Sequence, residues 1–258
     1  LHTEQDQESD DVRLSMHWLY TVRHAIERDD LVLYYQPVYH IPSGTIAYYE
    51  ALVRLVIDDK LVYPGEFISA LERFQEASLL DKHVISKAIK TLADNPRLPK
   101  LAINLSAQAF QNEQLVPLIA EKLAEYSVDP ARVIFELTES ASLTNLSATQ
   151  CMVKTLTEMG CAFSIDDFGT GFSTFSYLKS FPAETVKIDG SFVKELKNSE
   201  IDRALVRSIR DVAWTLGKMT VAEFVEDQET LDLLKEFKVE YAQGYFLGKP
   251  APIEALDI

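Results

Sequence analysis

Short apolar runs alternate with segments of helical periodicity along most of the chain. Between most of the runs, apolar residues recur every three or four positions, as they do on the buried face of a helix. The strand-like runs lie at 31–36, 45–53, 101–105, 132–137, 161–166, 185–188, 219–224 and 241–246. Eight strands that alternate with helices over roughly 230 residues predict a β/α barrel rather than an open sheet.

The first two strands depart from a regular barrel. The residues that connect them are only His40-Ile41-Pro42-Ser43-Gly44. Parallel strands need a crossover of roughly a dozen residues or more, whereas a short turn joins antiparallel neighbours. We therefore predict an α/β fold, a modified TIM (β/α)8 barrel with an antiparallel first strand.

The first 29 residues have a different pattern. Residues 1–10 are polar and acidic, which is typical of a frayed chain end, and apolar residues then recur at helical spacing over 14–26. We predict an N-terminal tail and connector helix over 1–29 and a single domain over 30–258. Because the chain starts with leucine rather than methionine, we expect it to be part of a longer protein.

Composition and charge narrow the function. With 40 acidic and 25 basic residues, the net charge is −15. Proteins that bind DNA or RNA generally depend on Lys and Arg at phosphates, so we expect no DNA or RNA binding. A small phosphorylated ligand remains compatible, since bound cations can supply local positive charge. No apolar run approaches the roughly 20 residues of a membrane span, and we expect no signal peptide.

Seven of the predicted strands have an ionisable or amide side chain at or near their carboxyl ends. In a β/α barrel these ends lie on one face, where the active site forms, so we expect the seven positions to converge. They are Glu50, Asn104, Glu136, the Asp166-Asp167 pair, Lys187, Glu223 and Gln243.

The residue types indicate a metal site of a particular kind. All five histidines lie in the first third of the chain and none is at a strand end, which argues against a zinc site built on imidazole. Carboxylates with one amide oxygen suit Mg²⁺ or Mn²⁺, and also Ca²⁺. The adjacent charges of Asp166 and Asp167 repel each other unless cations bind between them. Two such ions about 4 Å apart could bind a water and a scissile phosphate, so the pattern favours metal-assisted phosphate-ester hydrolysis.

Lys187 lies between apolar neighbours in the run Val186-Lys187-Ile188. A lysine that projects into the barrel needs a carboxylate or a metal-bound water as its partner. The alternative is a lysine whose ammonium reaches solvent at the barrel mouth.

An ordered set of motifs resembles EAL domains, the bacterial phosphodiesterases that linearise cyclic di-GMP. The resemblance covers about 30–250, nearly the whole chain. The motifs are Tyr34-Tyr35-Gln36-Pro37, Glu50-Ala51-Leu52, Asn104-Leu105-Ser106, Glu136-Leu137-Thr138-Glu139-Ser140, Asp166-Asp167-Phe168-Gly169-Thr170-Gly171, Lys187-Ile188-Asp189, Ala222-Glu223-Phe224-Val225-Glu226 and Gln243-Gly244-Tyr245.

The resemblance implies a role for each catalytic position. Asp166 would bridge two metals, and Asp167 would bind the second. Glu223 would bind this second metal or act as general base. Lys187 would orient the nucleophilic water. The ligands of the first metal would be Glu50, Asn104, Glu136 and Asp166.

Other positions would bind substrate or support a loop. Gln36, Arg54 and Tyr245 match residues that contact guanine or phosphate, and Gln243 matches one that supports the water or the substrate. Glu139 matches a glutamate that anchors the loop after the aspartate pair, a loop linked in this family to dimer contacts and metal binding.

The resemblance also implies cofactors and partners. The cofactor would be Mg²⁺ or Mn²⁺, two ions per active site, with Ca²⁺ inhibitory. The substrate would be cyclic di-GMP, cleaved to linear pGpG. We expect a homodimer, an upstream GGDEF (diguanylate cyclase) or other sensory domain, and a cytoplasmic location, including the cytoplasmic portion of an inner-membrane sensor.

The sequence departs from the family pattern at several positions, and two other functions stay open. Phe224 stands where many members have glycine, Val53 replaces a common leucine, and residues 172–175 vary the usual sequence. None of these changes removes a side chain expected to bind metal. The main alternative is a cyclic di-GMP receptor that does not hydrolyse its ligand, and the other is a hydrolase of a different phosphodiester.

Overall fold

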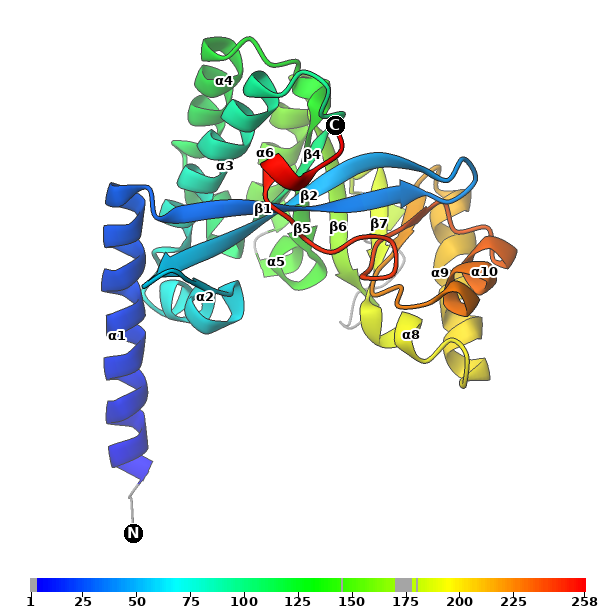
Figure 1. Ribbon diagram of the computed structural model, residues 1–258, viewed down its shortest axis with the longest axis horizontal. Helices are drawn as coiled ribbons and strands as arrows, with labels where there is room; N and C mark the ends of the chain where they lie inside the picture. Colours follow the sequence, from blue (N-terminus) through cyan, green and yellow to red (C-terminus); the bar gives the residue numbers. More distant parts are fainter. Residues whose placement is uncertain (1–3, 145, 170–177, 180) are drawn as a thin grey trace.

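Eight strands close into a barrel in the part of the chain that the computed structural model describes, which is residues 4–144, 146–169, 178–179 and 181–258. Each strand pairs with its neighbour around the barrel, and the barrel closes where the first two strands of the chain pair with each other (Figure 1). Their order around the barrel is β1 (Leu31–His40), β9 (Tyr241–Ala242), β8 (Met219–Ala222), β7 (Thr185–Ile188), β6 (Ala162–Phe168), β5 (Val133–Thr138), β4 (Leu101–Leu105) and β2 (Thr45–Ile57).

The orientation of β1 confirms the predicted modified barrel. β1 runs antiparallel to both of its neighbours, β2 and β9, whereas the other neighbouring pairs of the barrel are parallel. The cause is the short connection at 41–44, which leaves no room for a crossover helix.

A ninth strand, β3 (Lys60–Val62), was missed by the sequence analysis. β2 continues to Ile57, beyond the expected end at residue 53, and β3 pairs antiparallel with its last residues. The turn consists of Asp58 and Asp59, whose φ angles are 48° and 60°. Two consecutive positive φ angles match the twist of a tight hairpin, and aspartate tolerates them better than most residues.

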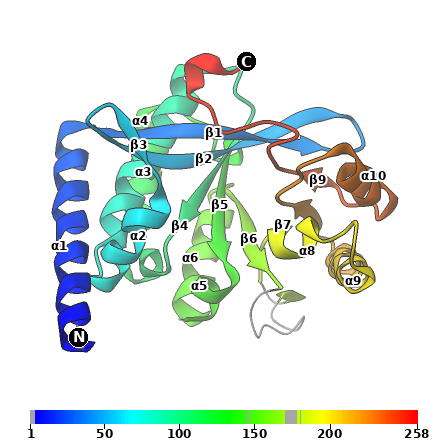
Figure 2. The ribbon, with the colours of Figure 1, turned by 60° about the horizontal axis from the view of Figure 1, so that its bottom comes forward.

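Helices cover the outside of the barrel, and the core lies between them and the strands (Figures 1 and 2). The segments of helical periodicity between the predicted strands form helices, and Gly217, with a φ of 72°, follows the end of the helix that precedes β8. The helices are α2 (Pro64–Arg73), α3 (Ala77–Asp94), α4 (Leu115–Glu125), α5 (Glu139–Thr144), α6 (Leu146–Glu158), α8 (Gly190–Lys194), α9 (Glu200–Thr215) and α10 (Gln228–Glu236), with short 3-10 turns at Ala107–Gln111, Pro130–Arg132 and Ile253–Ala255.

Helix α1 (Glu4–Arg28) stands beside α2 at one side of the molecule (Figure 1). It begins at Glu4, so the polar segment predicted to fray is mostly helical. Its second half packs on the domain through buried Val22 and through Trp18, whose ring lies 6.4 Å from that of Phe67. The division of the chain at residue 30 stays a prediction. None of the described helices combines the length and apolar character that a membrane span requires.

Candidate functional site

A buried lysine lies at the centre of four carboxylates. Lys187, on β7, has no exposed surface, and its Nζ atom lies 2.9 Å from both Glu136 Oε2 and Glu223 Oε1. The same Nζ lies 3.2 Å from Asp166 Oδ1 and 3.5 Å from Glu50 Oε2. These acids come from β5, from the residue after β8, from β6 and from β2, so the barrel brings together positions that are distant in sequence. The solvent-reaching alternative for this lysine is wrong.

The charges in this cluster do not balance. Burial lowers the pKa of Lys187, but the surrounding acids outweigh it and hold that pKa well above the ordinary value. Burial raises the pKa of Glu136 well above its usual range, and burial raises the pKa of Glu223 to about 7 despite the nearby ammonium. One ammonium therefore neutralises only part of the negative charge.

Two amide side chains fix Glu50. Asn104 Nδ2 donates to Glu50 Oε1 over 2.7 Å, and Gln243 Nε2 donates to Glu50 Oε2 over 2.6 Å. Gln243 Nε2 also lies 3.1 Å from Gln36 Oε1, and Gln36 Nε2 donates to the carbonyl of Gly248. These bonds and Lys187 outweigh the effect of burial, so the pKa of Glu50 is lowered. Glu50 lies in the middle of β2 rather than at its end, directly opposite Gln36 in the β1–β2 register.

The Asp166-Asp167 pair lies at an irregular point of β6. Consecutive strand residues normally point to opposite faces. Here the β6–β7 register shifts between Ile165 and Phe168, and Asp167 has a φ of 54°. Both carboxylates consequently turn toward the same region, where one oxygen each of Asp166, Asp167 and Glu223 lie within 4.8 Å of one another. Burial and the charge of Asp166 raise the pKa of Asp167.

Glu139 lies beside the start of the next loop. Its buried carboxylate accepts a hydrogen bond of 3.0 Å from the backbone N–H of Gly169, the last described residue before the loop. The loop that this glutamate was expected to anchor continues through 170–177, which lie outside the described residues.

The donor set fits divalent cations. Glu136 Oε1 and Gln243 Oε1 are buried and have no hydrogen-bond partner within the described part of the chain. Five carboxylates against one ammonium leave four formal negative charges, the charge that two divalent cations would neutralise. Oxygen ligands of this kind suit Mg²⁺ or Mn²⁺.

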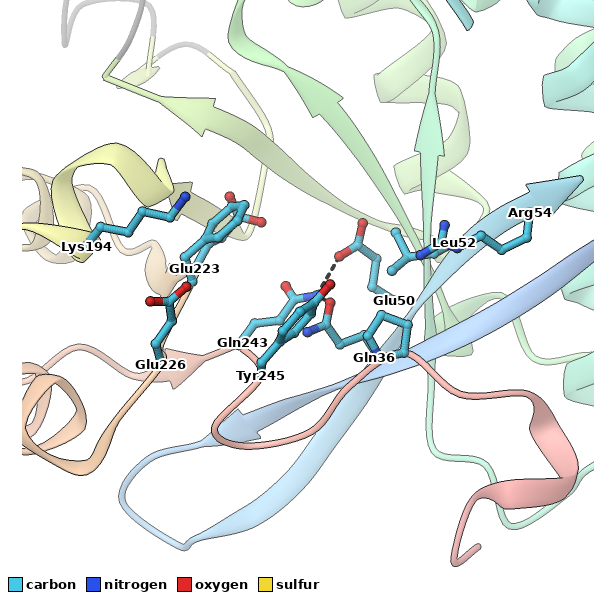
Figure 3. Close-up of a pocket in the computed structure, with 12 residues that line it drawn as sticks. Gln36, Glu50, Leu52, Arg54, Lys194, Glu223, Glu226, Gln243 and Tyr245 are labelled. Carbon is cyan, nitrogen blue, oxygen red and sulfur yellow. Dashed lines mark hydrogen bonds between the residues drawn. The ribbon is translucent and has the colours of Figure 1, made fainter. Parts of the chain in front are cut away.

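A cavity of about 320 Å³ opens beside the acidic cluster. Figure 3 shows Glu223 and Lys194 on one side of it and Arg54 on the other, with Glu50 and Tyr245 between them. The three residues predicted to contact guanine or phosphate all line this cavity. The full lining is Gln36, Glu50, Leu52, Arg54, Lys194, Glu223, Phe224, Glu226, Gln243, Gly244, Tyr245 and Pro250.

Comparisons with known proteins agree with the motifs. Residues 20–250 match the sequence model of a protein family that is described as EAL domain. The chain belongs to the EAL domain family of cyclic di-GMP phosphodiesterases.

The curated relatives of this EAL domain include enzymes. It is 37% identical over 258 residues to the cyclic di-GMP phosphodiesterase PdeB of Shewanella oneidensis, covering 98% of this chain and 30% of that protein. It is 35% identical over 243 residues to MucR of Pseudomonas aeruginosa, a bifunctional diguanylate cyclase and cyclic di-GMP phosphodiesterase, covering 92% and 36%. The chain thus spans about a third of the length of these relatives.

Solved structures show the same architecture. The P. aeruginosa MucR phosphodiesterase in complex with c-di-GMP superposes with a TM-score of 0.86 at 34% identity, over 92% of this chain and 98% of that one. The Xanthomonas citri FimX EAL domain in complex with c-di-GMP gives a TM-score of 0.88 at 25% identity, over 97% and 98%.

Sequence reasoning missed two charged residues that line the cavity of this EAL domain. Lys194 ends the short helix α8, which begins where the Asp189 side chain accepts a hydrogen bond from the N–H of Ser191. Glu226 follows β8 in the motif that also contains Glu223. Neither residue lies at the carboxyl end of a strand, where the other site residues were predicted. For Glu226 the shared motif was an available signal; for Lys194 the sequence offers none.

Proposed function

We propose that this EAL domain hydrolyses cyclic di-GMP to linear pGpG with two Mg²⁺ or Mn²⁺ ions. The observation that carries the proposal is the convergence of the oxygen donors beside a cavity, with Lys187 beneath them. Glu50, Asn104, Glu136 and Asp166 would hold one ion, and Asp166, Asp167 and Glu223 the other. When bound, such ions lower the pKa of a bound water toward about 7 and offset the charge of the phosphate.

The protein's own groups would then position the water and accept its proton. The buried ammonium of Lys187 presents donors at a fixed point and would orient the attacking water. Glu223, whose pKa of about 7 suits proton transfer near neutrality, would act as general base or as metal ligand. Gln243 and Asn104 would keep Glu50 in one rotamer through their hydrogen bonds.

Arg54 supports the substrate assignment. Its guanidinium lies 4.8 Å from the centre of the Tyr63 ring, and one of its nitrogens donates to the carbonyl of Val53. A guanidinium fixed in this way would bind a phosphate or a guanine edge with little loss of side-chain freedom. Gln36 and Tyr245 would supply further contacts.

A turnover assay tests the proposal. The isolated domain, given Mn²⁺ and cyclic di-GMP, should produce pGpG, and Glu50→Ala should reduce turnover below detection. Glu236→Ala, which removes an exposed acid on α10 that does not line the cavity, is the matched control. If Glu50→Ala cleaved cyclic di-GMP at the wild-type rate in saturating Mg²⁺, the metal assignment would be wrong.

The same assay separates the alternatives. Saturable binding of cyclic di-GMP without any pGpG would favour a receptor. Cleavage of linear dinucleotides or cyclic AMP in preference to cyclic di-GMP would favour a different phosphodiesterase. The homodimer and the upstream GGDEF or sensory domain stay predictions, and the first can be measured by the oligomeric state in the assay buffer.

A further inference from the structure

Phe224 has a backbone conformation that is rare for a bulky residue. It follows Glu223 directly and has a φ of 54°. In this left-handed region the Cβ atom crowds the backbone, so glycine, asparagine and aspartate are the usual occupants. Strained residues persist only where their surroundings hold them, and they gather at functional sites.

Helix α8 holds the ring in place. A Cβ atom on Gly190 would lie 2.0 Å from Cδ2 of Phe224, so the ring packs directly on the backbone of that glycine. Lys194 Nζ lies 4.0 Å from the centre of the same ring. Because residues 190 and 194 are one helical turn apart, both contacts come from the α8 side of the ring.

The remainder of the ring faces the cavity. Phe224 is 50% exposed and lines the cavity together with Glu223 and Tyr245. An aromatic side chain that is fixed on one side and open on the other provides a surface for a flat, apolar partner, and nucleic-acid bases stack on such rings whatever their sequence.

We propose that Phe224 is a specificity-determining residue whose open face stacks on one purine base of the cyclic dinucleotide. The inference rests on the proposed function, since it takes the ligand from there. It adds a residue that stands where many family members have glycine, so this chain would hold its ligand with a contact that a glycine cannot provide.

A ring that only narrowed the cavity would have the opposite effect on KM. If the ring instead narrowed the cavity, its removal would let the ligand enter more easily and KM would fall. If it stacks on a base, removal raises KM for cyclic di-GMP and weakens binding of cyclic di-GMP measured with Ca²⁺ in place of Mg²⁺.

Four variants distinguish these roles. Phe224→Gly removes the ring and the strain. Phe224→Leu removes the aromatic face but keeps an apolar side chain that is also disfavoured at this φ. It therefore separates the loss of the ring from the relief of backbone strain. Both should raise KM and Kd for cyclic di-GMP about ten- to a hundredfold, with a smaller effect on kcat. Phe224→Tyr and Phe224→Trp should restore KM to within about threefold of wild type.

The tryptophan variant also gives a spectroscopic readout. Its indole fluorescence should be quenched when cyclic di-GMP binds, because a stacked purine lies against it. The natural tryptophans, Trp18 on α1 and Trp214 on α9, do not line the cavity, so the wild-type emission provides the baseline.

The outcomes separate this inference from the function on which it depends. If wild type cleaves cyclic di-GMP while Phe224→Leu has an unchanged KM, or if Phe224→Gly lowers KM, the inference is wrong and the function stands. If wild type neither binds nor cleaves cyclic di-GMP, both are wrong. Thermal melts of the variants show that each is folded before its KM is compared.

Discussion

The ammonium of Lys187 is stabilised by the same acids that would bind metal. Removing the charge of one partner from a buried ion pair generally destabilises a protein by about 3–5 kcal/mol, because the other charge is left uncompensated. Here the Lys187 ammonium lies within 3.5 Å of four carboxylates. The stability of the metal-free domain therefore depends strongly on this one positive charge.

Replacing Lys187 by methionine should therefore destabilise the metal-free domain by about 3 kcal/mol or more. Mg²⁺ should then raise the melting temperature of the variant more than that of wild type, since added cations replace the missing charge. Melts in EDTA and in Mg²⁺ measure both effects. Replacing Lys154, an exposed lysine of α6, by methionine is the control, and its response to Mg²⁺ should equal that of wild type. Equal metal responses for Lys187→Met and wild type would contradict the charge argument.

The contact between Gly190 and Phe224 makes a second prediction at the scale of single residues. Gly190→Ala should destabilise the domain by about 1–3 kcal/mol, because the new methyl group overlaps the ring. In a Phe224→Gly background the same change should have little effect. Urea unfolding of the four proteins gives the coupling energy, and we expect at least about 1 kcal/mol. Additive effects would show that the ring does not rest on this glycine.

At the scale of elements, Asp81 ties helix α3 to the end of β4. Its buried carboxylate accepts hydrogen bonds from the backbone N–H of Ser106, over 3.1 Å, and from the Ser106 hydroxyl, over 2.6 Å. Ser106 lies two residues beyond Asn104, the side chain that donates to Glu50. Burial raises the pKa of Asp81 from 3.8 to about 6, with the two bonds from Ser106 opposing it.

This rise in pKa predicts a pH-dependent stability. Because the folded protein holds the proton more tightly than the unfolded chain, Asp81 lowers stability as pH rises from about 4 to 6, by about 3 kcal/mol in total. Asp81→Asn stays neutral throughout. The free energy of unfolding of Asp81→Asn minus that of wild type should therefore increase by about that amount between pH 4 and 7.

Urea unfolding at several pH values measures this difference, in which the titration of the other acids cancels. Asp94→Asn makes the same replacement at an exposed acid on the same helix and is the control for the substitution itself. A difference for Asp81→Asn that does not change with pH would show that this carboxyl is not buried in the way the structure indicates.

The predicted elements and the observed ones differ where local geometry depends on distant contacts. The barrel and its antiparallel first strand followed from the spacing of apolar runs and the length of one connection. Strand β3 was missed because three residues are too few to show periodicity, although the preceding Asp58-Asp59 pair is a turn signal. Glu50 lies in mid-strand because β2 extends to Ile57, where its last residues pair with the start of β1 and with β3.

The candidate site shows the same limit. The residue types at strand ends predicted which side chains converge, and Lys187 does lie among carboxylates. The sequence could not reveal that Asp167 turns out of the strand alternation, because that φ angle arises from the irregular β6–β7 pairing. The sequence could not reveal the contact of Phe224 with Gly190 either, since it joins the segment after β8 to the start of helix α8, which only the closed barrel brings together.

At the scale of the whole molecule, closing the barrel concentrates negative charge that the folded domain must accommodate. Some of it is neutralised by protons, since Glu136 has a strongly raised pKa and that of Glu223 is about 7. A divalent cation must displace these protons in order to bind. Its affinity should therefore rise with pH through about 7, as the proton becomes a weaker competitor.

We accordingly expect Mn²⁺ to raise the melting temperature more at pH 8 than at pH 6, and to release protons when it binds at pH 7. Calorimetric titrations in two buffers of different ionisation enthalpy count the protons released. Glu223→Gln should release fewer protons and bind Mn²⁺ more weakly, whereas Glu236→Gln, which neutralises a surface acid, should match wild type. Equal stabilisation by Mn²⁺ at both pH values, with no proton release, would mean that the cation binds to other acidic residues of the domain and not to this cluster.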